Sequence, residues 1–154
     1  MSQKEYLNKY LGDGDRASRL FFSKKMAPYD MTSSRFIFFV SINRHPGITQ
    51  AEIVRITVFE KSTVARGIAS LERDGFIYRV AEPDNRHISH CYATEKGKET
   101  YQHIDQIITD WNEKIYAKLS VPKDTAMALL SEISSIARDI LLEEIGVDYR
   151  IDKD

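Results

Sequence analysis

The most regular pattern of apolar and polar positions lies in residues 57–75. Val64, Ile68 and Leu71 recur there at helical spacing and share one side of a helix. Gly75 suits the end of that helix, because glycine readily takes the left-handed conformation that follows a last turn. Basic and hydroxyl side chains lie mostly away from the apolar stripe: Lys61, Ser62, Thr63, Arg66 and Arg73. We therefore predict a helix that packs by one face and offers the other to a polyanion.

The segments on either side of this helix complete a recognisable unit. Thr49 and Glu52 have the spacing of a capping box, so a shorter helix begins there. After Gly75, residues 76–81 and 87–93 read as two strands joined by a turn. Helix, turn, helix and ribbon together predict a winged helix-turn-helix, that is, a mainly α fold with a small two-stranded antiparallel wing.

The N-terminal part shows weaker helical patterns. Apolar positions predict a short amphipathic helix over residues 6–11, and the glycines and aspartates of residues 12–15 are expected to interrupt it. Asp15 is then placed to cap a second helix over residues 16–26, which Pro28 ends.

Three further helices are predicted around the wing unit. Residues 33–44, beginning at Thr32 or Ser33, are apolar enough for a buried scaffold helix. Thr94 suits the N-cap of a long helix that reaches Leu119, and after Pro122 the same apolar spacing returns over residues 123–145. Two long apolar stripes exceed what one small winged domain needs to cover itself. We therefore expect a two-fold homodimer.

Length and composition favour one cytoplasmic domain. A chain of 154 residues with ordinary apolar and charged fractions suits a single domain. It has no apolar run long enough for a bilayer and no secretory leader pattern, and its single cysteine, Cys91, fits a reducing compartment. Within residues 1–154 we expect N-terminal dimerisation helices over 1–31, a DNA-binding lobe over 32–98 and C-terminal dimerisation helices over 99–154.

Charge is divided unevenly along the chain. The net charge is −1, yet residues 35–98 hold ten Lys and Arg against seven acids, whereas residues 99–154 hold six against twelve. This asymmetry directs polyanion binding to the middle of the chain and a different task to its end.

At these residues the chain resembles the MarR family of bacterial transcription regulators. The matching landmarks are Gly47 to Glu52 (GITQAE), Lys61 to Val64 (KSTV), Arg66, Leu71 and Glu72 with Gly75, Arg79, Asp84, Arg86, and Thr94 to Gly97 (TEKG). Together with residues 27–32, they cover most of the chain. The resemblance implies a homodimer that binds double-stranded DNA at a pseudopalindromic operator, with repression as the expected output. It also implies that the first and last two helices form the dimer interface.

The chemistry of groove recognition selects the candidate residues. Arg66 is the best candidate for a base contact, because arginine pairs bidentately with guanine in the major groove. Arg86 at the wing tip suits a narrow minor groove, and the resemblance gives Asp84 the role of orienting it; the alternative is a surface ion pair that fixes the turn. Arg79 either contacts phosphate or braces the ribbon. The candidate DNA-binding residues are Thr49, Gln50, Lys61, Ser62, Thr63, Arg66, Arg73, Arg79, Asp84 and Arg86.

Three positions depart from the family pattern. Val58 stands where a small residue or glycine is usual, so we expect a different turn between the two helices, because a β-branched residue resists positive φ. Gly67 lies inside the predicted helix at a position that is usually apolar, and it indicates either close packing of another element or no structural feature. The segment from Asp84 to Thr94 is one residue longer than usual, which predicts a bulge or a shifted strand register.

Other chemistry is limited. A small aromatic effector is a further expectation from the resemblance, with candidate contacts at Phe21, Phe22, Phe36, Phe39 and Trp111, although such aromatics also suit a plain core. His87, His90 and Cys91 are poorly placed for one metal ion, because His87 and Cys91 would share a strand face that His90 does not.

The sequence shows no catalytic constellation and predicts no enzyme, cofactor or metal. Two alternative functions stay open. One is a winged protein-interaction module without DNA binding, and the other is a regulator switched by oxidation of Cys91.

Overall fold

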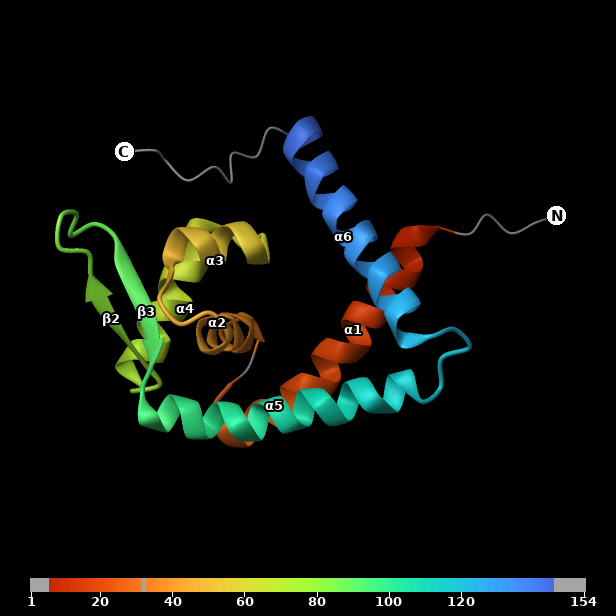
Figure 1. Cartoon of the computed structure of the whole chain (residues 1–154), viewed down its shortest axis with the longest axis horizontal. Coiled ribbons are helices and arrows are strands. Elements are labelled where there is room, and N and C mark those ends of the chain that lie inside the picture. The colour runs from red at the N-terminus through yellow and green to blue at the C-terminus, as the bar shows by residue number, and fades with distance from the viewer. Residues whose placement is uncertain (1–5, 32, 146–154) are drawn as a thin grey trace.

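The computed structural model describes residues 6–31 and 33–145 and shows a lobe joined to a helical arm (Figure 1). The helices are α1 (Leu7–Met26), the short 3-10 helix η1 (Ala27–Tyr29), α2 (Ser33–Arg44), α3 (Gln50–Thr57), α4 (Lys61–Arg73), α5 (Glu95–Tyr116) and α6 (Lys123–Ile145); the strands are β1 (Ile48–Thr49), β2 (Ile77–Ala81) and β3 (Ser89–Ala93). The lobe consists of α2, α3, α4 and the three strands, and the arm consists of α1, α5 and α6. The predicted boundaries at 1, 32 and 154 lie outside the described residues.

The N-terminal segment forms one continuous helix, so the predicted interruption at residues 12–15 is wrong. Side-chain ion pairs one turn apart span the glycine-containing stretch: Lys9 Nζ lies 2.9 Å from Asp13 Oδ2, and Arg19 Nε lies 2.8 Å from Asp15 Oδ2. Such pairs support a helix and offset part of the cost of glycine. Asp15 therefore pairs within α1 instead of capping a second helix. The helix ends at Met26, just before Pro28, as predicted.

The lobe packs around α2, as its apolar sequence predicts. Phe38 and Phe39 on α2 are fully buried, and the largest set of helix contacts in the lobe joins α2 to α4. Gly67 on α4 explains this close approach, because a Cβ atom there would lie only 2.3 Å from Phe38 Cδ2. Among the described residues, every buried apolar side chain lies between Met26 and Ile104. The core therefore belongs to the lobe and its junction with α1 and α5.

The turn between α3 and α4 is sharper than its sequence suggests. Thr49 and Glu52 form the predicted capping box at the start of α3. Val58 ends α3 in the left-handed region, with φ 59°, so the expectation that this residue avoids positive φ is wrong. Its N–H donates to Val54 O over 3.0 Å, and the neighbouring Phe59 packs against Phe38. The half-buried Phe59 packs against the core, and this packing opposes the backbone strain of Val58, which is about 1–3 kcal/mol.

The wing belongs to a three-stranded antiparallel sheet in the order β1-β3-β2, so the sequence analysis missed one strand. β1 has two residues, too few to show an alternating pattern, and Ile48 pairs with Cys91 of β3. β2 and β3 pair without interruption from Ile77 opposite Ala93 to Ala81 opposite Ser89. The predicted bulge or shifted register is therefore wrong, because the ladder is regular and the extra length lies outside it.

The C-terminal helices follow the prediction closely. Thr94 Oγ1 accepts the Gly97 N–H at 3.0 Å and caps α5, which ends at Tyr116, three residues before the predicted Leu119. α6 spans Lys123–Ile145 and turns back from the far end of α5 toward the top of the view (Figure 1). None of the helices formed by residues 6–31 and 33–145 combines the length and apolar character that crossing a bilayer requires.

Candidate nucleic-acid interface

The outward face of α4 is polar, as its pattern predicts. Val64, Ile68 and Leu71 are buried beneath the helix, whereas Ser62 and Arg66 are exposed. Arg66 Nη2 lies 3.4 Å from Thr63 Oγ1, a long hydrogen bond that leaves the guanidinium at the surface. Lys61 is exposed at the first turn, and Arg73 is exposed at the last. The burial of one side of α4 therefore fixes which side chains face solvent.

Two candidates at the start of α3 are less available than expected. The Thr49 N–H and Oγ1 both donate to Glu52 Oε2, over 2.8 Å and 2.9 Å, so neither donor is open to a phosphate. The same backbone N–H lowers the pKa of the Glu52 carboxyl, because it favours the charged form. Gln50, the first residue of α3, is half-buried. In this structure, Thr49 therefore caps the start of α3, and its phosphate contact stays a prediction.

Arg79 braces the ribbon against α4. Its Nε and Nη2 both donate to Glu72 Oε2, the Nε at 3.0 Å. This contact lowers the pKa of the Glu72 carboxyl and raises that of the Arg79 guanidinium. Of the two roles that the sequence leaves open, bracing is the one formed in this structure.

The wing tip presents Arg86 at its surface. Asp84 and Arg86 are both exposed, and within the described residues no ion pair joins them, so the orienting role of Asp84 stays a prediction. Asn85 shapes the tip instead: its Oδ1 accepts the His87 N–H at 3.1 Å, and its carbonyl accepts the Ile88 N–H at 3.0 Å. The tendency of asparagine to bond its own backbone two residues on was a signal that the sequence analysis did not use.

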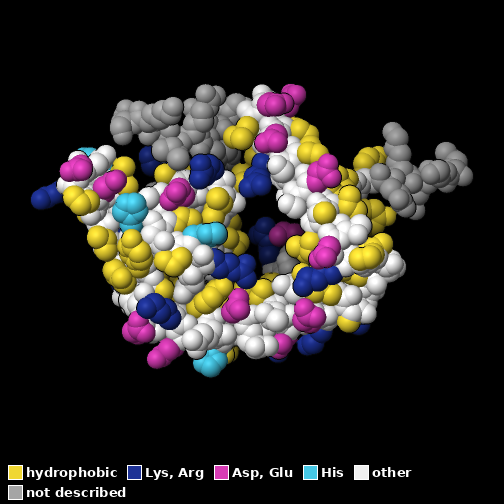
Figure 2. All heavy atoms as spheres, in the orientation of Figure 1, with side chains coloured by type: hydrophobic (Ala, Val, Ile, Leu, Met, Phe, Trp, Pro, Cys, Tyr) yellow, Lys and Arg dark blue, Asp and Glu magenta, His cyan; other side chains and the backbone are white. Residues whose placement is uncertain are grey.

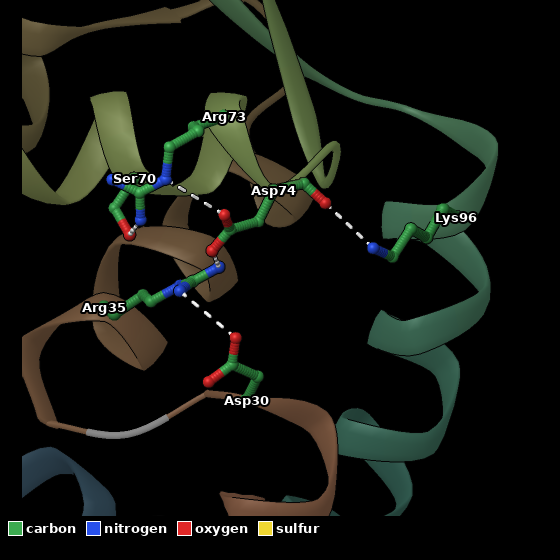
Figure 3. A network of polar contacts seen from close by, with 6 residues as sticks. All are labelled: Asp30, Arg35, Ser70, Arg73, Asp74 and Lys96. Atoms are coloured by element: carbon green, nitrogen blue, oxygen red, sulfur yellow. Dashed lines mark hydrogen bonds and ion pairs between the residues drawn. The ribbon is translucent and has the colours of Figure 1, made fainter.

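Sequence reasoning also missed a group of charged residues where α4 meets β2. Arg73 Nε lies 3.1 Å from Asp74 Oδ1, and Arg35 Nη2 lies 2.7 Å from Asp74 Oδ2 (Figure 3). The two arginines lower the pKa of the Asp74 carboxyl, Arg73 contributing more than Arg35. Arg35 sits 39 residues earlier in the chain, so no local pattern connects it to Asp74.

The candidate effector residues divide between two hollows and the core. Phe22 and Phe36, whose ring centroids lie 5.3 Å apart, line both a hollow of about 640 Å³ between α1 and α2 and a smaller one of about 280 Å³. Trp111 lines the smaller hollow together with Arg44. The ring of Phe21 packs against Trp111, with 4.4 Å between the ring centroids. Phe39 is fully buried against Phe76 and lines neither hollow, so its place in an effector site stays a prediction.

The cysteine and histidine chemistry does not form a site. Cys91 is 1% exposed, and burial raises the pKa of its thiol to about 11. His90 Nδ1 lies 2.8 Å from Gly47 O, and His87 lies in the tip before β3 begins, so the strand-face assignment of His87 is wrong. Within the described part of the chain, no three His, Cys, Asp or Glu side chains gather as a metal site needs.

Comparison with known proteins places this arrangement in a family. Residues 29–86 match the model of the MarR family. The chain is 31% identical over 112 residues to the helix-turn-helix-type transcriptional regulator YybA of Bacillus subtilis (strain 168), covering 71% of this chain and 75% of that protein.

Solved structures show the same fold. The crystal structure of the transcriptional regulator SlyA matches with a TM-score of 0.77 and 26% identity, covering 88% of this chain and 94% of that one. A MarR family regulator from Listeria monocytogenes, solved in complex with 26mer DNA, matches with a TM-score of 0.80 and 21% identity over 99% of each chain. On its sequence, its winged lobe and these likenesses, the chain belongs to the MarR family of DNA-binding transcriptional regulators.

Proposed function

We propose that this protein is a homodimeric regulator that represses transcription by binding a pseudopalindromic operator. The observation that carries the proposal is the two-sided α4: its apolar side is locked into the lobe, and its other side exposes Ser62 and Arg66. A helix so held fits the major groove, where Arg66 reads a base and Lys61 and Thr63 bind phosphate or sugar. Arg86 at the wing tip reaches the adjacent minor groove.

The arm supports the homodimer. The apolar side chains of α6 are largely exposed, Leu129 at 54%, Ile136 at 49% and Ile140 at 54%, as are Leu7 and Leu20 on α1. Figure 2 shows the molecule hollowed in its centre, between the lobe and α6. Exposed apolar stripes on two helices need an apolar partner surface, and a second copy of the chain supplies the same stripes under two-fold symmetry. Dimerisation also spaces two α4 helices for two half-sites about one helical turn apart.

A small aromatic effector fits the hollows beside α1 and α2. Phe22, Phe36 and Trp111 provide apolar walls, and Arg44 provides one cation at the edge of the smaller hollow. Because these residues belong to helices that join the lobe to the arm, an occupant would favour one separation of the two α4 helices over another. Release of DNA is the outcome that we propose.

The experiment that tests DNA reading is a salt series of binding to a selected genomic site and to scrambled duplex. Arg66→Ala is expected to weaken specific binding by about 1–3 kcal/mol for each half-site. Arg86→Ala is expected to weaken binding and to reduce the salt dependence. Lys114→Ala, an exposed loss of positive charge on α5, outside α4 and the wing, is the matched control. Because α5 belongs to the proposed dimer interface, sedimentation first verifies that this variant is dimeric, and its DNA binding should then equal that of the wild type.

The outcome decides between functions. If the Arg66→Ala and Arg86→Ala double variant binds the site as well as the wild type, α4 and the wing are not the reading elements. If the wild type binds no DNA at all, the protein-interaction module becomes the better account.

A further inference from the structure

The turn between α4 and β2 is held from three directions (Figure 3). It contains Asp74, which follows the last residue of α4, and Gly75, which takes φ 76° as predicted for the residue after the cap. Arg35 approaches from α2, Arg73 from α4 and Lys96 from α5.

The carboxylate of Asp74 is shared between two guanidinium groups. Oδ2 lies 2.7 Å from Arg35 Nη2, and Oδ1 lies 3.1 Å from Arg73 Nε. The Arg35 side chain is only 15% exposed, and its second partner, Asp30 Oδ2, is more distant at 3.6 Å. A nearly buried cation needs a close counterion, and Asp74 is the nearer of the two carboxylates beside Arg35.

The two arginine partners of Asp74 differ in solvent exposure. Arg35 stands on the first turn of α2, the central helix of the lobe, whereas the Arg73 side chain is 72% exposed on the outward face of α4. Arg73 Nη2 also lies 3.3 Å from Ser70 Oγ. Asp74 therefore links a cation inside the lobe to an exposed cation in the last turn of α4.

Side chains at the start of α5 donate hydrogen bonds to the backbone carbonyls of the same turn. Lys96 Nζ donates to Asp74 O over 2.8 Å, and Thr94 Oγ1 donates to Gly75 O over 2.7 Å. Gly97 completes the fit, because a Cβ atom there would lie 2.0 Å from Phe76 O. α5 is thus attached directly to the end of the reading helix.

The ring of Phe76 contacts both Arg35 and Lys96. Phe76 is 5% exposed, with the Arg35 guanidinium carbon 5.4 Å and Lys96 Nζ 4.2 Å from its ring centroid. Cations over an aromatic ring are stabilised by its quadrupole. A movement of α5 relative to α2 therefore disturbs both cations and the turn that they hold.

From these contacts we infer that Arg35 and Asp74 are positioning residues for operator recognition, which fix the direction of α4 and the guanidinium of Arg73 relative to α2 and α5. The inference rests on the proposed reading of DNA by α4. Neither residue needs to touch DNA. Their ion pair sets the angle at which Arg66 and Ser62 meet the groove, and the contacts of Lys96 tie that angle to α5 of the arm.

The test measures the ratio of affinities for a selected operator and for scrambled duplex. The variants are Arg35→Gln, Asp74→Asn and the double variant, with Arg35→Lys to restore the charge. Positioning predicts that each single variant lowers this ratio by roughly tenfold and that the double variant loses less than the two combined. Arg35→Lys should recover part of the ratio.

A purely electrostatic effect gives a different result. Removing the charge of Asp74 would strengthen binding to both duplexes, and removing that of Arg35 would weaken both, with the ratio unchanged. A purely structural effect would lower the melting temperature and leave the ratio of the folded protein unchanged, which circular dichroism at the assay temperature verifies. Either result overturns the inference. The wild-type protein measured beside the variants separates this failure from a failure of DNA binding itself.

Discussion

The lobe and α6 carry similar apolar spacing in sequence but differ in what covers it. α4 buries Val64, Ile68 and Leu71 within its own chain, whereas α6 contributes no buried side chain among the described residues. The same period of three to four residues predicts both helices, because each needs an apolar partner. α4 therefore finds its apolar partner within its own chain, whereas the apolar stripe of α6 has none among the described residues.

The largest expected effect comes from placing a charge on the exposed stripe of α6. Ile136→Asp should dissociate the homodimer and reduce operator affinity by about a hundredfold or more, because two linked half-site contacts become independent. Sedimentation gives the oligomeric state and a titration gives the affinity. Ser135→Asp, on the other side of α6, is the control. An Ile136→Asp protein that remains dimeric would remove α6 from the proposed interface.

A second prediction contrasts glycines in the lobe and in α1. Gly67→Ala should destabilise the protein by about 1–3 kcal/mol, because the new methyl group meets the fully buried ring of Phe38. Gly14→Ala should stabilise it by about 0.5–1 kcal/mol, because a Cβ atom there has no neighbour within 4 Å and alanine favours helix. Denaturant unfolding at one protein concentration compares them. A cost at Gly14 would place the partner chain against that face of α1.

A third prediction concerns acid. The folded pKa of Glu72 lies below its ordinary value of 4.5, chiefly because of the hydrogen bond from Arg79. Its stabilising effect is therefore complete above about pH 4.5 and is lost as the pH falls through the folded pKa. The pair is partly exposed, so Glu72→Gln should cost only about 0.5 kcal/mol at pH 7, and the cost should shrink as the pH falls through the folded pKa of Glu72. A cost that does not change with pH would assign the effect to packing instead.

The smallest expected effect is at Cys91. With its thiol buried and its pKa raised to about 11, Cys91 should react very slowly with a thiol reagent at pH 7, and peroxide should not change DNA binding. The reaction should become fast in denaturant, where the lobe opens. Rapid reaction of the native protein, together with peroxide-sensitive binding that Cys91→Ser abolishes, would restore the redox-switched alternative.

Local signals predicted most of the lobe, and long-range contacts account for what they missed. The capping box of Thr49 and Glu52, the glycine after α4 and the cap at Thr94 each act within a few residues, so the sequence contains them. The two-residue β1 and the pair between Arg35 and Asp74 depend on parts of the chain that fold together from a distance.

The errors have equally specific causes. α1 runs through its glycines with the support of exposed ion pairs one turn apart, and Val58 takes positive φ beside Phe59, which packs against Phe38. In the candidate site, the outward residues of α4 followed directly from helical periodicity. Phe39 and Thr49 did not, because only packing shows that an aromatic ring is enclosed or that a donor is already used.

Operator recognition by a homodimer can be tested by selecting genomic DNA fragments with the purified protein and then measuring the footprint and the stoichiometry on the enriched site. We expect one two-fold symmetric site whose half-sites lie about one helical turn apart, bound by two chains with an affinity that falls steeply as the salt concentration rises. Enrichment of no sequence, or binding of a single chain to an asymmetric site, would contradict it.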